Sequence, residues 1–416
     1  MKKFLLLSIL PLVIIFVLFE LSLRLAGYES PLMDPYASFV EHRPLFELKD
    51  CMLTTDPGRT AFFHETSFQA DKPSGHVRFF LFGGSAAYGY KLERAVDENY
   101  GALLAGLLHE RSPGTTFEAI NCGGICYASY RLVGLVEECL RHSPDFIIVA
   151  SGHNEFLEPR HYRELLTARK GSVSFMRLCR TAQLVQHLAT AVRDKGQGPA
   201  PPEPTVLAPD RIDERYIVRD RNEFDQTRLH FVHNIRRIVD MCRKKKVPVL
   251  LCTLPSNLRD WPPFHTSAGD ALPERMMTSQ FGAITELMAN GKHEQALTIA
   301  KDVLQLHPDA AAFYYLAGKC SDAVGNTKEA LALYRLARDR DGFPHRVPSS
   351  FTSEIRKMSS EPGVILFDGD KLFAENSPDG IPGNNLFLDQ CHPNAEGHKL
   401  LAAGLLDTMS AAGLVK

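Results

Sequence analysis

The sequence predicts an α/β protein with a buried parallel sheet that helices cover on both faces. Five short apolar runs, rich in β-branched and aromatic residues, are the first observation: 77–82, 117–121, 146–150, 247–254 and 364–367. The second is that segments with helical spacing, such as 92–110 and 131–141, separate these runs. Continuous apolar runs that alternate with helices are typical of strands buried on both faces. The third is that four runs end in polar or glycine-rich sequences, where open parallel sheets bind ligands.

The chain begins with a basic and then strongly apolar segment. Lys2 and Lys3 precede the run 4–19, which is slightly shorter than the roughly 20 residues that a membrane helix needs. Leucines just beyond the run extend its apolar character. A cleavable signal peptide is the alternative, but residues 22–27 offer a poor cleavage site. We expect residues 1–27 to form an uncleaved signal-anchor, a transmembrane helix that leaves the rest of the chain on the extracytoplasmic (periplasmic) side.

Composition excludes several classes of function. The 47 basic and 49 acidic side chains give a formal net charge of −2, so nothing in the charge favours nucleic acid as a partner. The nine cysteines form no metal-spaced cluster, and the chain contains neither a dinucleotide-binding glycine motif nor a phosphate-binding loop. We therefore expect no cofactor and no metal. Residues 28–75 lack clear periodicity and are expected to link the anchor to a globular domain over 76–416.

A helical insertion is predicted between the fourth and fifth apolar runs. Residues 291–297 and 325–331 repeat one another with an offset of 34, the period of a helical-pair repeat. The segment 312–341 resembles a tetratricopeptide repeat in six positions: Tyr315, Leu316, Gly318, Ala330, Tyr334 and Ala337. So few repeats cannot form a free solenoid. We expect residues 279–341 to pack on the α/β core, with the binding of a protein partner as the alternative.

The ends of the apolar runs carry candidate catalytic residues. Ser85 follows the first run and two glycines, and Asn154 follows the third run; each alone is more simply a helix cap. Asp389 and His392 stand three apart on a predicted turn, a spacing that lets a carboxylate orient an imidazole. A single such pair is also more often a capped helix. With the glycine-rich sequence 121–126 after the second run, four distinctive sequences stand at one edge of the sheet and together favour a catalytic site.

These sequences resemble the four blocks of the SGNH hydrolase superfamily, also called the GDSL esterase/lipase family. The blocks are the nucleophile motif at 82–89, the glycine block at 121–126, the Gly-x-Asn block at 151–155 and Asp389-x-x-His392. The resemblance covers about residues 77–152, 247–256 and 364–410. It implies a flavodoxin-like three-layer α/β/α sandwich and a catalytic triad of Ser85, His392 and Asp389.

The resemblance also implies an oxyanion hole made by the Ser85 N–H, the Asn154 side chain and one N–H of the glycine block. Cys126 stands at the position of the family's oxyanion glycine, and Gly124 is the alternative donor. Two further departures are Gly84, where the family often has aspartate, and Glu155, where the third block has aspartate.

The implied activity is that of a serine esterase that removes an O-acyl group from an envelope glycan or lipid through an acyl-serine. An O-acyltransferase that uses the same serine is an alternative, because both reactions share the first half. A non-catalytic envelope scaffold that binds a partner through the tetratricopeptide-like helices is the alternative of a different class.

Overall fold

The computed structural model describes residues 2–28, 36, 39–40, 43–158, 179–193, 221–266 and 274–415. It divides into two compact units, one of residues 1–40 and 160–202, the other of residues 41–159 and 203–416. The first unit contains helices α1 (Lys2–Leu25) and α8 (Arg180–Arg193). The Glu20 carboxylate of α1 accepts hydrogen bonds from the backbone N–H groups of Arg180 (2.9 Å) and Thr181 (2.8 Å), which caps the start of α8.

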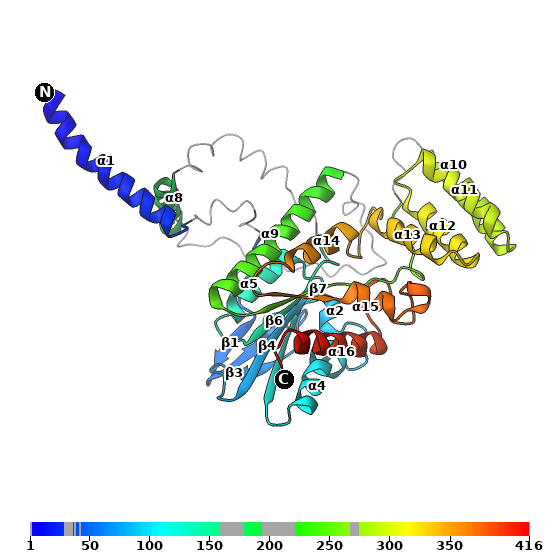
Figure 1. The fold of residues 1–416 in the computed structure, drawn as a ribbon, viewed down its shortest axis with the longest axis horizontal. Coiled ribbons are helices and arrows are strands. Elements are labelled where there is room, and N and C mark those ends of the chain that lie inside the picture. Colours follow the sequence, from blue (N-terminus) through cyan, green and yellow to red (C-terminus); the bar gives the residue numbers. More distant parts are fainter. Residues whose placement is uncertain are drawn as a thin grey trace. The chain divides into compact units, whose positions relative to one another are not determined.

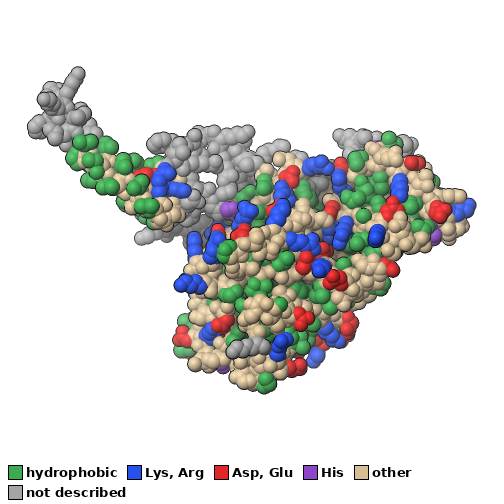
Figure 2. Space-filling model, in the orientation of Figure 1, with side chains coloured by type: hydrophobic (Ala, Val, Ile, Leu, Met, Phe, Trp, Pro, Cys, Tyr) green, Lys and Arg blue, Asp and Glu red, His purple; other side chains and the backbone are tan. Residues whose placement is uncertain are grey.

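The predicted N-terminal helix forms, but its membrane-spanning character is not supported. Within the described residues, no helix meets the length and apolar content that crossing a membrane requires. The apolar side chains of α1 from Leu10 onward that the structure describes are mostly exposed (Figure 2).

The second unit is built on a five-stranded parallel sheet, which confirms the predicted α/β class (Figure 1). The strand order is β5-β4-β6-β7-β8, the flavodoxin-like arrangement 2-1-3-4-5. All five strands coincide with the apolar runs to within two residues: β4 (His76–Gly83), β5 (Thr116–Gly123), β6 (Phe146–Ala150), β7 (Val249–Thr253) and β8 (Val364–Asp368).

Helices cover both faces of this sheet, as the sequence predicted (Figure 1). One face carries α4 (Tyr100–Arg111), α15 (Gly369–Glu375) and α16 (Ala395–Ala411). The other carries α5 (Ser129–Cys139), α9 (Arg221–Lys245) and α14 (Ser349–Met358). Strand residues such as Phe79, Ile148 and Leu250 are fully or almost fully buried between the layers. This burial holds the strand ends, and the loops that follow them, in fixed positions.

A small antiparallel sheet lies within the segment predicted as a linker. Its strands are β1 (Phe46–Lys49), β2 (Met52–Thr55) and β3 (Ser67–Gln69). Its first strand is tied to α5, because Glu138 accepts the N–H groups of Leu45 (2.8 Å) and Phe46 (3.0 Å). Residues 43–75 therefore belong to the compact second unit, and of residues 28–42 only 28, 36, 39 and 40 are described.

The helical insertion consists of two hairpins, α10 (Glu274–Ala289) with α11 (His293–Leu306) and α12 (Ala311–Ala323) with α13 (Thr327–Asp339). Gly318 lets these last two helices approach closely, since a Cβ there would lie 2.8 Å from the Tyr334 ring. The insertion packs on the α/β core, where Tyr334 joins Leu258 and Ile381 in one apolar cluster. An ion pair of 2.9 Å between Arg259 and Asp322 adds to this contact.

Candidate active site

The candidate site lies where β4 and β6 end, at the carboxyl edge of the sheet. β4 pairs with β5 on one side and β6 on the other, so the loops that follow these strands diverge and leave room for a ligand. Ser85 is the first residue of the short helix α2 (Ser85–Tyr88), directly after β4. The helix ends at Tyr88, and the left-handed φ of 87° at the next residue, Gly89, lets the chain turn back at once.

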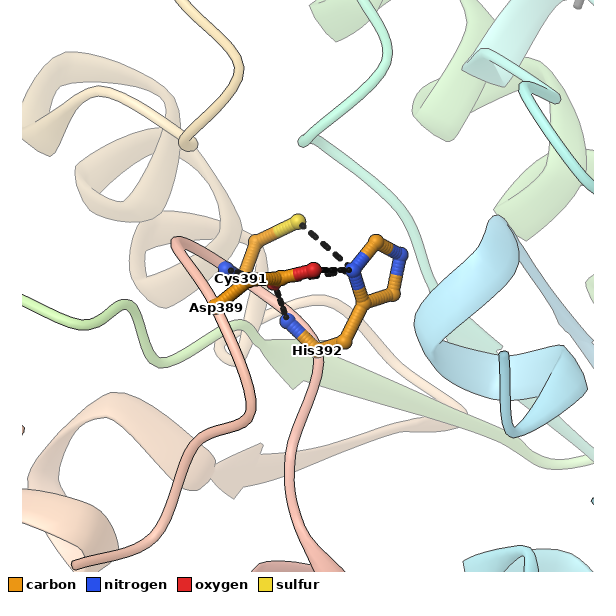
Figure 3. A group of neighbouring side chains, drawn as sticks. All are labelled: Asp389, Cys391 and His392. Atoms are coloured by element: carbon orange, nitrogen blue, oxygen red, sulfur yellow. Dashed lines mark hydrogen bonds and ion pairs between the residues drawn. The ribbon is translucent and has the colours of Figure 1, made fainter. Parts of the chain in front are cut away.

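The structure brings Ser85, His392 and Asp389 into one hydrogen-bonded chain. His392 Nε2 lies 2.8 Å from Ser85 Oγ, and His392 Nδ1 lies 2.7 Å from Asp389 Oδ2. Asp389 Oδ1 also accepts the backbone N–H groups of Cys391 (3.0 Å) and His392 (2.9 Å), which fixes the turn. Figure 3 shows the carboxylate and the imidazole facing each other across this turn. The three residues predicted as a triad are thus in the geometry that a triad requires.

Electrostatics at the site favour a charged Asp389. Burial alone would raise the pKa of Asp389, but hydrogen bonds from His392 and Lys91 hold that pKa well below its usual value. For His392, burial disfavours the imidazolium, yet the adjacent Cys391 and Asp389 outweigh it and raise the pKa of the imidazole. The carboxylate therefore stabilises the charge that His392 would acquire on taking a proton from Ser85.

Asn154 lies beside Ser85 in the same cavity, as predicted. Its Nδ2 donates a hydrogen bond of 3.0 Å to the Tyr127 carbonyl oxygen, which fixes the direction of the amide. Gly84 makes this position possible, since a Cβ at residue 84 would lie 2.3 Å from Asn154 Nδ2. The absence of a side chain at residue 84 thus leaves the space that the Asn154 amide occupies.

The two alternative donors of the glycine block differ in their surroundings. The Gly124 N–H donates to the Gly83 carbonyl oxygen at 3.0 Å and is therefore engaged within the sheet edge. Cys126 has a φ of 64°, in the left-handed region that favours glycine, and it stands where the family has glycine. Cys126 therefore has a backbone conformation that is more usual for glycine.

Two neighbours of Asn154 support the loop after β6. Glu155 accepts hydrogen bonds from the Ser129 N–H (2.7 Å) and hydroxyl (3.0 Å), so it caps the start of α5. His153 Nδ1 accepts the Val347 N–H at 3.0 Å, and burial lowers the pKa of His153 to about 3. His153 is therefore neutral and supports the cavity wall. The structure also separates His398 from this group, because its Nδ1 accepts the Tyr100 N–H at the start of α4.

Two residues that sequence reasoning missed complete the surroundings of the triad. The Tyr90 ring lies over His392, with 5.1 Å between ring centroids. Lys91 Nζ lies 2.6 Å from Asp389 Oδ2. Nothing in the sequence marks either residue, because the contacts join positions about 300 residues apart.

Among the described residues, Asp389, Cys391 and His392 form a set whose ligand atoms are close enough to hold a metal ion. Figure 3 shows why we assign no metal to it, since the imidazole nitrogen nearest the carboxylate is already hydrogen-bonded to it. The Lys91 ammonium lies on the same carboxylate and would repel a cation. We therefore assign these atoms to the hydrogen-bonded chain with Ser85.

Comparison with known proteins identifies the repeat in the helical insertion and finds solved structures with partial similarity to this chain. Residues 287–346 match the tetratricopeptide repeat family. No curated protein matches the chain. Similar solved structures include an acetyl xylan esterase (14% identity, TM-score 0.36, 81% of this chain and 99% of that chain covered). They also include a putative lipolytic protein of the G-D-S-L family from Desulfitobacterium hafniense (9%, 0.35, 80% and 99%) and an acetylxylan esterase from Geobacillus stearothermophilus (12%, 0.36, 80% and 94%).

TM-scores below 0.5 leave the geometry of the site as the basis for a functional assignment. The chain contains a tetratricopeptide segment, and the solved structures to which it is similar include esterases and lipases of the GDSL type, the family whose sequence blocks it resembles.

Proposed function

We propose that this protein is a serine esterase that cleaves a carboxylic ester through an acyl-serine intermediate. The observation that carries the proposal is the continuous chain of short hydrogen bonds from Ser85 Oγ through His392 to Asp389. A serine that merely capped α2 would not require a buried imidazole and a charged carboxylate behind it.

The residues have complementary roles in this reaction. His392 Nε2 takes the proton of Ser85 as Oγ attacks the ester carbonyl carbon, and Asp389 stabilises the resulting imidazolium. The Ser85 N–H, at the start of α2, and the Asn154 amide donate to the oxyanion of the tetrahedral intermediate, with the Cys126 N–H as the proposed third donor. The protonated His392 then delivers its proton to the leaving alcohol. Water repeats the sequence on the acyl-serine and releases the acid.

The cavity next to Ser85 favours a short acyl group. The cavity that Ser85 lines has a volume of about 10 Å³ and is also lined by Ala86, Ala150, His153 and Leu254, among others. About 10–15 Å³ is the room that one water-sized group needs. At this volume the cavity favours the methyl group of an acetyl ester over a long acyl chain.

The natural ester is proposed to belong to an envelope glycan or lipid outside the cytoplasm. This location rests on the sequence, in which the apolar run 4–19 follows two lysines, and on the exposed apolar side chains of α1. Fractionation of cells that produce the full-length chain tests it. Release of the protein from membranes by a carbonate wash would contradict an anchoring helix.

Transfer of the acyl group to a second alcohol uses the same residues and remains the alternative within this chemistry. Hydrolysis and transfer can be distinguished by supplying an alcohol in water and measuring whether the acyl group appears as free acid or as a new ester. Formation of a new ester in preference to free acid would assign a transferase.

The direct test is hydrolysis of p-nitrophenyl acetate by the full-length chain, beside Ser85→Ala. We expect activity in the parent and a loss of roughly 10³-fold or more in the variant. Ser353→Ala, which changes an exposed serine on α14, is the matched control and should leave the rate unchanged. Folded parent protein without turnover of any short-chain ester would contradict the proposal and favour the scaffold alternative.

A further inference from the structure

The carboxylate of Asp389 is bound by a cation as well as by His392. Lys91 Nζ and His392 Nδ1 both contact the same oxygen, Oδ2, at 2.6 Å and 2.7 Å. The Asp389 side chain is 3% exposed and that of Lys91 is 41% exposed, so the ammonium reaches in from the surface. The pair is therefore shielded on one side and hydrated on the other.

The turn that presents Lys91 is tied to the nucleophile. The N–H groups of Gly89 and Tyr90 both donate to the Ser85 carbonyl oxygen, at 3.1 Å and 3.0 Å. Lys91 itself has a φ of 71°, a conformation that residues other than glycine rarely adopt. Such a residue at a site edge persists only where surrounding contacts hold it. The ion pair with Asp389 is a contact that stabilises Lys91 in this conformation.

Other groups face His392 without duplicating Lys91. Cys391 Sγ lies 3.9 Å from His392 Nδ1, and the Tyr90 ring covers the imidazole. The buried imidazoles of His153, His345 and His398 have lowered pKa values, mainly through desolvation, so they are neutral. Arg346, beyond α13, acts on His153 and on Cys391. Among the lysines and arginines that the structure describes, Lys91 forms the ion pair with Asp389.

We propose that Lys91 is a positioning residue of the active site, which holds the Asp389 carboxylate against His392 and offsets part of its charge. This inference rests on the proposed function of the triad. The geometry points to Lys91 because, in the part of the chain that the structure describes, it is the contact of the carboxylate that comes from the turn after Ser85. Lys91 thus couples the turn after Ser85 to the acid of the triad.

The proposal has a consequence for the protonation of His392. A carboxylate stabilises the imidazolium, and a cation on that carboxylate weakens the stabilisation. Without the ammonium, the full charge of Asp389 would act on His392, and the pKa of His392 would rise. A protonated His392 cannot accept the Ser85 proton, so the acid limb of the pH–rate profile would move to higher pH.

The test compares the parent with Lys91→Met, Lys91→Arg and Lys49→Met in the full-length chain. Lys49 forms an exposed ion pair with Glu47, so its variant removes a lysine without touching the site. For Lys91→Met we expect the acid limb of kcat/KM for p-nitrophenyl acetate to shift upward by roughly 0.5–1 pH unit, the low end of the range for a nearby charge because Lys91 is partly hydrated. Lys91→Arg should restore the parent profile, and Lys49→Met should not change it.

A second measurement separates this proposal from the proposed function. The pKa of His392 is followed by NMR in histidine-labelled parent and Lys91→Met, with His392→Asn to assign the signal. Because the Cys391 and His392 N–H groups still hold Asp389 in place, a rise in the pKa of His392 on loss of Lys91 supports the charge-offsetting role of Lys91, even if no ester is turned over. If folded Lys91→Met gives the same His392 titration and the same pH–rate profile as the parent, the proposed role of Lys91 is overturned. A parent that is inactive and whose Ser85 does not react with a fluorophosphonate would overturn only the esterase assignment.

Discussion

Gly84→Ala should disable the oxyanion hole while leaving the fold intact. Residue 84 has φ −88° and ψ −157°, an extended conformation that alanine adopts freely, so the backbone is not strained. The new Cβ would instead lie 2.3 Å from Asn154 Nδ2, far inside van der Waals contact, and the amide must move. Loss of one oxyanion donor costs roughly 10²–10³ in kcat, or about 2.7–4 kcal/mol of transition-state stabilisation.

The assay is the steady-state hydrolysis of p-nitrophenyl acetate by Gly84→Ala, Asn154→Ala and the double variant. Because both substitutions remove the same donor, the double variant should be no slower than Asn154→Ala alone. Gly106→Ala is the matched control, since a Cβ at residue 106 of α4 meets no atom within 4 Å. A kcat for Gly84→Ala within about threefold of the parent, or a double variant whose losses multiply, would refute the reasoning.

Three further predictions concern the triad and the insertion. His392 acts as the base in its neutral form, and its pKa is raised, so kcat/KM should fall as the pH drops through that pKa, with a midpoint above pH 6.5. A midpoint at or below pH 6.5 would contradict this prediction. Gly318→Val should lower the free energy of unfolding by about 1–3 kcal/mol in urea, because its Cβ meets the Tyr334 ring, whereas Gly282→Ala on α10 should be neutral. Arg346→Met should lower the free energy of unfolding by about 3–5 kcal/mol, because the Arg346 guanidinium donates to buried carbonyl groups and pairs with the buried Asp341 carboxylate. An unchanged midpoint of urea unfolding would refute this.

The sheet was predictable because its strands are buried on both faces. A strand such as β6 (Phe146–Ala150) must be apolar along its whole length, and this leaves a continuous signal in the sequence. The small antiparallel sheet left no such signal. Its strands have three or four residues, and burial alternates within them or is confined to one end, too short a pattern to distinguish from a loop.

The candidate site was predictable where its residues directly follow strands. Ser85 and Asn154 follow β4 and β6, and Asp389 and His392 stand on one turn, so local spacing placed all four at the same edge. Lys91 could not be found in this way. Its contact depends on a left-handed turn and on a partner almost 300 residues away, and neither is encoded in a local pattern.

The backbone donor of the glycine block could be only partly predicted from the sequence. The sequence left Gly124 and Cys126 as alternatives, because counting along a loop does not say which N–H points toward the serine. The structure adds that the Gly124 N–H is already bound to the Gly83 carbonyl and that Cys126 adopts a glycine-like φ.

The most direct test of the central claim is covalent labelling of the full-length chain with a fluorophosphonate, mapped to a residue by mass spectrometry. The serine oxygen attacks phosphorus and fluoride leaves, a reaction that requires an activated nucleophile. The account predicts labelling at Ser85 in the parent and its loss in His392→Ala, which retains the serine but removes its base. A parent that stays unlabelled, or a folded His392→Ala that is labelled as fast as the parent, would contradict it.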